Sequence, residues 1–464
     1  GDSVETIAES AFNSCTSMTD VTFGKNVKTI GNYAFNYCAS LKSVKLPDSV
    51  ESIGSWAFRD DDAITELTFG KGIKTINDYA FYDCGGITSV KFPSSLTSIG
   101  YESFRNCSSL KEIEINGNGA TIGNYAFEYG YNVESIVIGD GVKNINYGTF
   151  YDNRSLKSLT ISDSVETIGD YAFYNCRAFE ELALSEDLKT IGNWAFQNCI
   201  GLKNISIGKN LSSISSTAFY GDTALENIEV SEDNATYSDY DGALLNKEQT
   251  SILLYPKSKA GDYTIPDTVT SIGDRAFENS VGLTGINTGN GVKNIGVCAF
   301  NGCTALKNAV IGDSVETIAE SAFNYCTSLK SVKLPDSVES IGTSAFRNDD
   351  AITEVTFGNG IKTIGNSAFY DCDSITAVRI PSSLTYLGNS SFANCDSLKN
   401  IEINGNGATI GNYAFQYCNN VESIVIGDGV KNINYGAFYD NRNLKSLTIS
   451  DSVETIGDYA FYNC

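Results

Sequence analysis

The sequence predicts a solenoid of about 20 stacked coils, and a 23-residue repeat is the main observation behind this prediction. A phenylalanine recurs every 23 residues, except for one step of 58 residues between Phe219 and Phe277. A fixed period of this length indicates a solenoid, because one such unit cannot bury its apolar face alone. A second observation is the alternation of apolar and polar residues late in each repeat, which is typical of a half-buried strand. The recurring residues, called here the core Phe residues, are Phe12, Phe35, Phe58, Phe81, Phe104, Phe127, Phe150, Phe173, Phe196, Phe219, Phe277, Phe300, Phe323, Phe346, Phe369, Phe392, Phe415, Phe438 and Phe461.

Each repeat divides into three segments. Ile stands five residues before the core Phe in every repeat but one, where Leu387 replaces it. We expect this run, VKTIG at 27–31, to form a short extended segment. The AFxxC segment at 34–38 is too short for a helix and is expected to form a 3₁₀ turn. Apolar residues nine and eleven positions after the Phe, such as Val44 and Leu46, predict a strand, and these strands should stack in parallel into one long sheet.

The position four residues before the core Phe is Gly in 13 of 19 repeats. Asn replaces Gly in three more repeats, at Asn77, Asn146 and Asn434. Gly alternating with Asn favours a backbone with positive φ. Ala8 and Ala319 fit this interpretation less well, so the position could instead require only a small side chain.

Composition excludes several classes of function. The net charge of −24 disfavours a nucleic-acid partner or an anionic membrane surface. Histidine is absent, which excludes His-dependent nucleophiles and His-ligated metals. No apolar run could span a bilayer, and no signal peptide is visible at Gly1. We therefore expect no cofactor and no membrane insertion here. The chain starts at the beginning of a repeat and stops within another, which indicates a fragment of a longer protein.

Cysteine is concentrated at one position of the repeat. Of 13 cysteines, 12 lie three residues after a core Phe, and only Cys298 lies elsewhere. Buried free thiols are the favoured interpretation, because buried Cys behaves as a small hydrophobe. A metal site is disfavoured by the lack of a CxxC pair. Oxidation of adjacent pairs stays open, since stacked coils would hold neighbouring thiols about 5 Å apart.

The units LKSVKLPDSVESIGSWAF (41–58) and YTIPDTVTSIGDRAF (263–277) resemble the BspA-type, or Treponema-type, leucine-rich repeats of bacterial surface proteins. The pattern LxxVxLPxxVxxIGxxAFxxC is specific, and the resemblance covers essentially the whole chain. It implies a right-handed leucine-rich repeat solenoid with short parallel β-strands on the concave side, 3₁₀ or irregular turns on the convex side and little regular α-helix. It also implies a location at the cell surface or outside the cell, and a role in adhesion or protein recognition.

One departure from the pattern concerns the proline that follows the strand. Gly or Ser replaces it in most repeats, which is expected to loosen that corner. Proline remains at Pro47, Pro93, Pro266, Pro335 and Pro381.

Three segments are expected. Residues 1–230 form an array of ten 23-residue coils, residues 231–264 form an atypical coil with a β-hairpin insertion, and residues 265–464 continue the array. The stretch ALLNKEQTSILLYP (243–256) predicts the hairpin, because two apolar runs flank a polar turn. A loop is expected at 233–242. The insertion could serve recognition or be merely tolerated. The hairpin residues expected to continue the core are Leu244, Leu245, Ile252, Leu253 and Leu254.

An internal duplication identifies a candidate binding surface. Residues 24–176 map onto 312–464, and DSVETIGDYAFYNC recurs unchanged at 163–176 and 451–464. In this comparison Tyr33, Trp56 and Tyr79, each two positions before a core Phe, correspond to serines. These serines are Ser321, Ser344 and Ser367. A position that accepts Trp or Ser is not core. The first half should therefore expose an aromatic column that could bind a partner. The candidate residues are Tyr33, Trp56, Tyr79, Tyr125, Tyr171 and Trp194, beside Tyr37, Tyr82, Tyr129, Tyr151 and Tyr174. Alternatively, these rings only stack and shield the coil edges.

Charged residues favour structural roles. A column seven residues after the core Phe alternates in sign from coil to coil, which predicts exposed ion pairs. Asp60, Asp61 and Asp62 could bind Ca²⁺, although three successive carboxylates are more typical of a solvated turn. The charged column consists of Lys111, Glu134, Lys157, Glu180, Lys203 and Glu226.

We expect a non-catalytic cell-surface protein that mediates adhesion or protein–protein recognition, with a protein or host-matrix partner. The alternative is a structural spacer or scaffold that presents another module absent from this segment. A hydrolase would need paired carboxylates in a cleft, and no pocket-forming insertion accompanies the many Asp and Glu residues. The chain is expected to be a monomer or to associate end to end.

Overall fold

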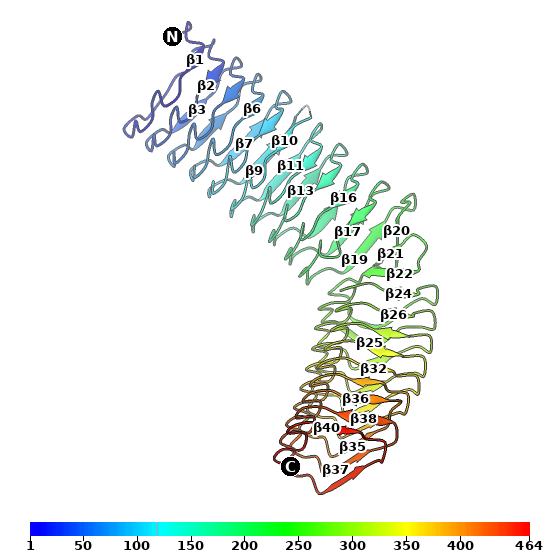
Figure 1. The fold of residues 1–464 in the computed structure, drawn as a ribbon. Coiled ribbons are helices and arrows are strands. Elements are labelled where there is room, and N and C mark those ends of the chain that lie inside the picture. The colour runs from blue at the N-terminus through cyan, green and yellow to red at the C-terminus, as the bar shows by residue number, and fades with distance from the viewer. Residues whose placement is uncertain (118) are drawn as a thin grey trace. The chain divides into compact units, whose positions relative to one another are not determined.

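The computed structural model describes residues 1–117 and 119–464, and within these residues it contains strands and turns but no helix. The chain divides into two compact units, Gly1–Ser238 and Asp239–Cys464. Figure 1 shows strands recurring in successive coils within each unit. The leucine-rich repeat solenoid expected from the sequence is therefore the fold of the chain.

In the first unit, the Ile-containing strands form one continuous parallel sheet. Each strand pairs with the strand 23 residues later, so that Thr6 lies opposite Thr29 and Ile7 opposite Ile30. The β-branched Thr and Ile side chains suit this pleated surface. The strands, in sheet order, are β1 (Thr6–Ile7), β2 (Thr29–Ile30), β4 (Ser52–Ile53), β6 (Thr75–Ile76), β8 (Ser98–Ile99), β10 (Thr121–Ile122), β12 (Asn144–Ile145), β14 (Thr167–Ile168), β16 (Thr190–Ile191) and β18 (Ser213–Ile214).

The second unit has an equivalent sheet, which begins with an antiparallel hairpin and continues with parallel strands. Another strand, β20 (Tyr237–Tyr240), spans the residues at which the two units meet in sequence. The sheet contains β21 (Ala243–Asn246), β22 (Ser251–Leu254), β24 (Ser271–Ile272), β26 (Asn294–Ile295), β28 (Thr317–Ile318), β30 (Ser340–Ile341), β32 (Thr363–Ile364), β34 (Tyr386–Leu387), β36 (Ala408–Ile410), β38 (Val430–Ile433) and β40 (Thr455–Ile456).

The strands that follow the core Phe were expected to form one long sheet, and this expectation was wrong. They form several short parallel sheets instead. In the first unit these are β3 (Ser43–Lys45) with β5 (Glu66–Thr68); β7 (Ser89–Phe92), β9 (Glu112–Ile115), β11 (Ser135–Ile138) and β13 (Ser158–Ile161); and β15 (Glu181–Ala183), β17 (Asn204–Ile207) and β19 (Asn227–Val230). In the second they are β23 (Gly261–Thr264), β25 (Leu283–Asn287) and β27 (Asn308–Val310); β29 (Ser331–Lys333) with β31 (Glu354–Thr356); and β33 (Ala377–Ile380), β35 (Asn400–Ile403), β37 (Ser423–Ile426) and β39 (Ser446–Ile449).

Proline accounts for three of these breaks. In an unbroken ladder, the residue after the strand donates its N–H to the preceding coil, as Ser162 does to the Ile138 carbonyl at 2.9 Å. Proline has no N–H to donate. Pro93, Pro335 and Pro381 follow β7, β29 and β33, the strands at which a new sheet begins. The ladder continues at some corners with Gly or Ser, as at Ser162, and breaks at another, Ser185, which follows β15. Nothing in the structure explains the break before β15.

The AFxxC segment forms successive turns rather than a continuous 3₁₀ helix. The N–H of Ala34 donates to Gly31 O at 3.3 Å and closes a local turn, whereas the N–H of Phe35 donates to Ala57 O of the next coil at 2.7 Å. This alternation of local and inter-coil bonds holds each turn to its neighbour. It places positive φ angles two residues before and two residues after the core Phe, as at Tyr33 (55°) and Tyr37 (59°).

The glycines four residues before the core Phe do not carry the positive φ that was expected. Their role is close packing between coils, because a Cβ built on Gly54 would lie 2.5 Å from the backbone of Gly31 and Asn32. Where Asn stands instead, as at Asn77, its side-chain amide donates to Ile53 O at 2.9 Å. The alternative interpretation, a position that requires a small side chain, is correct for these glycines.

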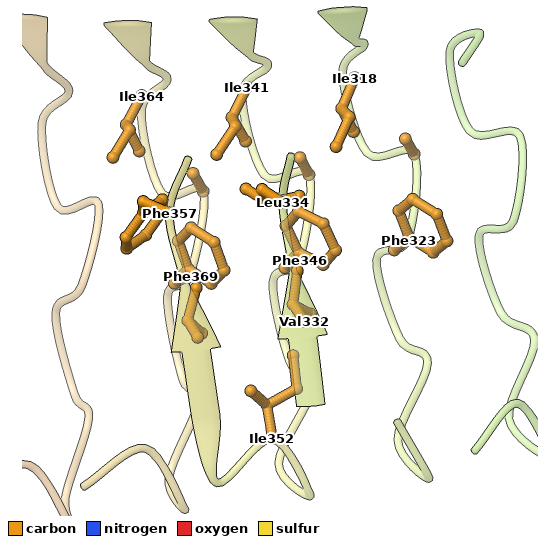
Figure 2. Packing of buried hydrophobic residues seen from close by; sticks show 14 of the residues in the cluster. Ile318, Phe323, Val332, Leu334, Ile341, Phe346, Ile352, Phe357, Ile364 and Phe369 are labelled. Carbon is orange, nitrogen blue, oxygen red and sulfur yellow. The ribbon is translucent and has the colours of Figure 1, made fainter. Parts of the chain in front are cut away.

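The core Phe residues stack on one another inside each unit. Phe35 and Phe58 have ring centroids 5.1 Å apart and planes within 1° of parallel, and both are fully buried. Figure 2 shows the same arrangement for Phe323, Phe346 and Phe369, with the Ile column beside the rings. Each coil therefore covers the core of the next, as a solenoid requires.

The atypical coil contains the predicted hairpin, in which β21 and β22 pair antiparallel. Leu244, Leu245 and Ile252 are buried as expected, whereas Leu253 and Leu254 are only half-buried. A residue that the sequence prediction missed, Tyr255, enters the core instead. Its ring stacks on Phe277 with centroids 4.6 Å apart, and its N–H donates to Ala276 O at 2.8 Å. Tyr255 therefore takes the place of a core Phe. The segment 233–242, expected to be a loop, includes β20.

Candidate functional site

Eight aromatic rings contact one another in series across eight coils of the first unit, and we call them the aromatic ridge. Neighbouring ring centroids lie between 3.9 Å (Trp56–Tyr79) and 6.4 Å (Tyr33–Trp56) apart. The ridge contains all six candidate residues expected from the sequence. Its members are Tyr33, Trp56, Tyr79, Tyr101, Tyr125, Tyr147, Tyr171 and Trp194.

Two members of the ridge, Tyr101 and Tyr147, were missed by sequence reasoning. They stand three residues before the core Phe, because Glu102 and Gly148 occupy the expected position. A Cβ built on Gly148 would lie 2.6 Å from the Tyr125 ring, so Gly148 makes room for that ring. Tyr101 directly precedes Glu102, and Tyr147 directly precedes Gly148. This adjacency is the sequence signal that could have identified both tyrosines as ridge residues.

The ridge rings are stacked and also partly exposed. Tyr33 and Tyr147 are 36% and 38% exposed, and the other members are half-buried. The ridge residues two positions before the core Phe have positive φ, as at Trp56 (59°) and Trp194 (52°). The rings thus shield one another while leaving a continuous aromatic strip open to a partner.

Arg59 sits against three rings at one part of this surface. Its guanidinium carbon lies 4.9 Å from the centroid of Trp56, 5.6 Å from Tyr37 and 5.9 Å from Tyr82. Its Nε lies 3.0 Å from Asp60 Oδ2. Trp56 of the ridge and the neighbouring Tyr37 and Tyr82 therefore hold a cation between aromatic faces and a carboxylate, an arrangement that favours guanidinium binding.

Arg105 repeats this arrangement two coils further on. Its guanidinium carbon lies 5.2 Å from the Tyr129 ring and 5.9 Å from the Tyr82 ring. It also pairs with the nearly buried carboxylates of Glu102 at 2.6 Å and Glu128 at 2.9 Å. Burial raises the pKa of Glu128 to about 7, although the charge of Arg105 opposes the shift.

The second unit carries only parts of this surface. Ser321, Ser344 and Ser367 occupy the positions of Tyr33, Trp56 and Tyr79 and keep the same positive φ. The aromatic series resumes near the end of the unit, where neighbouring centroids of Tyr413, Tyr435 and Tyr459 lie 5.3 Å apart. The turn backbone therefore forms with or without the aromatic side chains.

The other candidate sites expected from the sequence, the three successive aspartates and the cysteine column, have structural roles. Asp61 is fully buried, whereas Asp62 is exposed and accepts the Gly85 N–H at 3.0 Å, so the expectation of a solvated trio was wrong for Asp61. In residues 1–117 and 119–464, no three His, Cys, Asp or Glu side chains converge as metal ligands. The predicted column of buried thiols is present, and Cys84 Sγ donates to Phe58 O at 2.8 Å.

Ion pairs form in the alternating column as expected. Lys157 lies 2.9 Å from Glu134, and Lys203 lies 2.8 Å from Glu180. All four side chains are well exposed, so each pair contributes little to stability. These contacts join coils on the outside of the strands and define no binding site.

Comparison with known proteins identifies the repeat. The model of the BspA-type leucine-rich repeat region matches residues 5–132, 120–241, 254–372 and 339–464, which together span almost the whole chain. The chain belongs to the BspA-type leucine-rich repeat family. Repeats of this family and fold are generally non-catalytic. No curated protein matches this BspA-type chain.

Leucine-rich repeat proteins of known structure resemble the chain, and the first of them shares its fold. A leucine-rich repeat protein from Eubacterium ventriosum is 23% identical, covers 82% of this chain and 83% of its own, and has a TM-score of 0.53. A leucine-rich repeat protein from Bacteroides ovatus is 23% identical, with coverages of 95% and 91% and a TM-score of 0.47. The pneumococcal vaccine antigen PcpA is 19% identical, with coverages of 96% and 92% and a TM-score of 0.45.

Within the described residues of this BspA-type chain, no helix is long and apolar enough to cross a bilayer.

Proposed function

We propose that this BspA-type protein is a non-catalytic cell-surface protein that mediates adhesion or protein–protein recognition, and that the aromatic ridge is its contact surface. One observation carries the proposal: eight partly exposed rings run in series along the first unit, whereas the duplicated coils replace the first three with serine. Aromatic side chains dominate many protein interfaces, because they bury large areas at low entropic cost. Family membership supports a non-catalytic role at the cell surface.

The partner presents cationic side chains to the ridge. Arg59 and Arg105 illustrate the binding mode within the protein. The Arg59 guanidinium lies against Trp56 of the ridge, the Arg105 guanidinium lies against Tyr82 and Tyr129 beside the ridge, and each lies next to a carboxylate. The net charge of −24 attracts a basic partner and disfavours an acidic one. An exposed cation–π contact contributes roughly 0.5–1 kcal/mol, so recognition needs several such contacts along the strip.

The tryptophans of the ridge allow binding to be followed by intrinsic fluorescence. The only two tryptophans of the chain, Trp56 and Trp194, both belong to the ridge. Titration with an arginine-rich peptide should change the tryptophan fluorescence saturably, and added salt should weaken the binding. A glutamate-rich peptide of equal length should leave the fluorescence unchanged.

Variants test whether the ridge mediates binding. Trp56→Ser with Trp194→Ser should weaken binding of the arginine-rich peptide about tenfold or more by calorimetry. Tyr386→Ser is a matched control, because Tyr386 is 38% exposed but lies outside the ridge. Equal binding by the tryptophan variant and the wild type would remove the ridge from the proposal.

Immobilised host-matrix proteins test the broader role. The isolated chain should bind at least one of them with an affinity that the Trp56→Ser/Trp194→Ser variant loses. A chain that binds neither the peptide nor any matrix protein would instead act as a spacer that holds another module.

A further inference from the structure

The side chain three residues after the core Phe is fully enclosed in most coils, and we call its place the inner position. In twelve of the coils this side chain, eleven times a cysteine and once Asn153, donates a hydrogen bond to the carbonyl of the core Phe in the preceding coil. Cys326 Sγ donates to Phe300 O at 3.2 Å, and Asn153 Nδ2 donates to Phe127 O at 2.9 Å. The thiols and the amide of Asn153 can both make this bond because each supplies a hydrogen. The cysteines that make this bond are Cys38, Cys84, Cys107, Cys176, Cys199, Cys303, Cys326, Cys372, Cys395, Cys418 and Cys464.

Aspartate occupies the inner position in both copies of the duplication. Asp61 and Asp349 are fully buried, and one oxygen of each accepts a backbone N–H from the preceding coil at 2.6 Å, that of Cys38 and Cys326 respectively. The second oxygen of each, Oδ2, is buried and has no hydrogen-bond partner. An ionised carboxylate has no hydrogen to donate, whereas a protonated carboxyl has one. Only the neutral acid can therefore make the bond that these cysteines and Asn153 make at this position.

The groups around both carboxyls also favour the neutral form. Asp61 faces the thiols of Cys38 and Cys84 in the adjoining coils and the carboxylates of Asp60 and Asp62 in its own turn. Burial, reinforced by these two negative charges, raises the pKa of Asp61 to about 8.

Asp349 lies in an equivalent environment. It faces Cys326 and Cys372 in the adjoining coils, Asp350 in its own turn and the more distant Cys303. Burial first, and then the charge of Asp350, raises the pKa of Asp349 well above its usual range. The same arrangement therefore occurs at the duplicated position of each unit. A third aspartate, Asp222, also occupies the inner position of the first unit, where its Oδ1 accepts the Cys199 N–H at 2.8 Å.

We infer that Asp61 and Asp349 are protonated in the folded protein and act as proton-dependent clasps, each joining its coil to the preceding core Phe. Each clasp donates from Oδ2 to the carbonyl of that residue, Phe35 or Phe323. Loss of the proton leaves a buried charge beside a carbonyl oxygen and an unmet acceptor, which loosens these coils first. The device makes the solenoid sensitive to rising pH at two defined places.

The direction in which stability changes with pH follows from proton linkage. An unfolded aspartate titrates near pH 4, whereas folded Asp61 titrates at about 8. Between these values the folded state holds a proton that the unfolded state lacks. Each clasp therefore raises the unfolding equilibrium constant about tenfold per pH unit as pH rises through this window.

The test compares the full chain with Asp61→Asn/Asp349→Asn, because asparagine already occupies this position at Asn153 and donates the required bond. The double variant should be more stable than wild type at pH 8, and its urea midpoint should change less between pH 5 and 8. Hydrogen exchange should localise the difference to residues 38–84 and 326–372. Asp48→Asn is the matched control, because Asp48 is exposed and its Oδ1 likewise accepts a backbone N–H of an adjoining coil, that of Lys71 at 2.8 Å. Parallel pH profiles for wild type and the double variant would overturn the inference.

A second readout does not depend on the stability of variants. The infrared spectrum of the folded protein at pH 6 should contain the carbonyl stretch of protonated, buried carboxylic acid, and the double variant should show less of it. If difference spectra between wild type and the double variant lack this band, Asp61 and Asp349 are ionised and the clasp does not exist.

Discussion

Trp56 and Tyr79 stack face to face in adjacent coils, with ring centroids 3.9 Å apart and planes within 6° of parallel. The duplicated positions hold Ser344 and Ser367, whose backbone has the same positive φ. The stacked pair is therefore an addition to the coil and not a condition for its formation. This separation between surface and scaffold makes the ridge testable by substitution.

Trp56→Ser should cost only about 1 kcal/mol of unfolding free energy, the usual contribution of an aromatic pair beyond its buried area. The coil should keep its backbone, because serine occupies the same conformation at Ser344. Urea unfolding monitored by circular dichroism gives the measurement. The converse variant, Ser344→Trp, should fold normally. A loss of several kcal/mol in Trp56→Ser would mean that the ring supports the core and would weaken its assignment as a surface.

Phe58→Ala should cost far more, about 3–5 kcal/mol, because the ring is fully buried between Phe35 and Phe81. In a solenoid this loss should concentrate in neighbouring coils rather than spread over the chain. Hydrogen exchange should therefore show deprotection around residues 35–81. Phe12→Ala is the matched control, since Phe12 is 40% exposed in the first coil and should cost less. Equal losses for both variants would contradict the stacked-core interpretation.

The repeat period made the core predictable, because residues 23 apart lie above one another in successive coils. It correctly placed the Phe and Ile columns and the thiol column, and the six aromatic candidates lie in one series in the first unit. Residues that depart from the 23-residue period were not predicted. Tyr101 and Tyr147 reach the ridge from the neighbouring position, and Tyr255 reaches the core from a coil of different length.

Backbone conformation was less predictable than side-chain columns. Gly at a recurrent position indicates either a positive φ or a close approach, and the sequence does not distinguish them. Gly54 is required because the backbone of the neighbouring coil approaches closely. The residue with positive φ in this turn is instead Trp56, a residue type that rarely adopts such a φ. Stacking of each turn on the next imposes this conformation, and such an inter-coil cause has no signature within a single repeat.

Pro381→Ser should extend the ladder at the gap between β31 and β33. Serine restores an N–H that can donate to Phe357 O, as Ser162 donates to Ile138 O in an unbroken ladder. The gap now contains a cavity of about 630 Å³ lined by residues that include Glu354, Thr356 and Arg379. Hydrogen exchange of residues 354–381 should slow in the variant. Pro335→Ser offers an independent copy of the test at β29, and unchanged exchange in both would exclude proline as the cause of the breaks.

Glu166→Gln should weaken the protein mainly at neutral and mildly acidic pH. Glu166 lies 2.6 Å from Lys189 and 2.9 Å from Lys143, and hydrogen bonds to these two lysines lower its pKa to about 2. A lowered folded pKa means that the contribution is present above the unfolded value, near pH 4, and is lost as pH falls toward 2. The effect should be small, because the groups are exposed, and it should shrink in high salt. A variant that loses as much stability at pH 2 as at pH 7 would show that the carboxylate charge is irrelevant.

The stability of the whole chain should therefore be highest in mildly acidic solution rather than at neutral pH. Exposed carboxylates such as Glu166 lose their contribution as pH falls below about 4, whereas Asp61 and Asp349 oppose folding increasingly as pH rises above about 4. Urea midpoints measured from pH 3 to pH 9 should peak near pH 4–5. Asp61→Asn/Asp349→Asn should move the peak toward neutral pH, because it removes only the loss at higher pH. Glu166→Gln should reduce the slope of the acidic side slightly and leave the other side unchanged. A wild-type maximum at pH 7 or above would contradict the opposed action of these two kinds of carboxyl group.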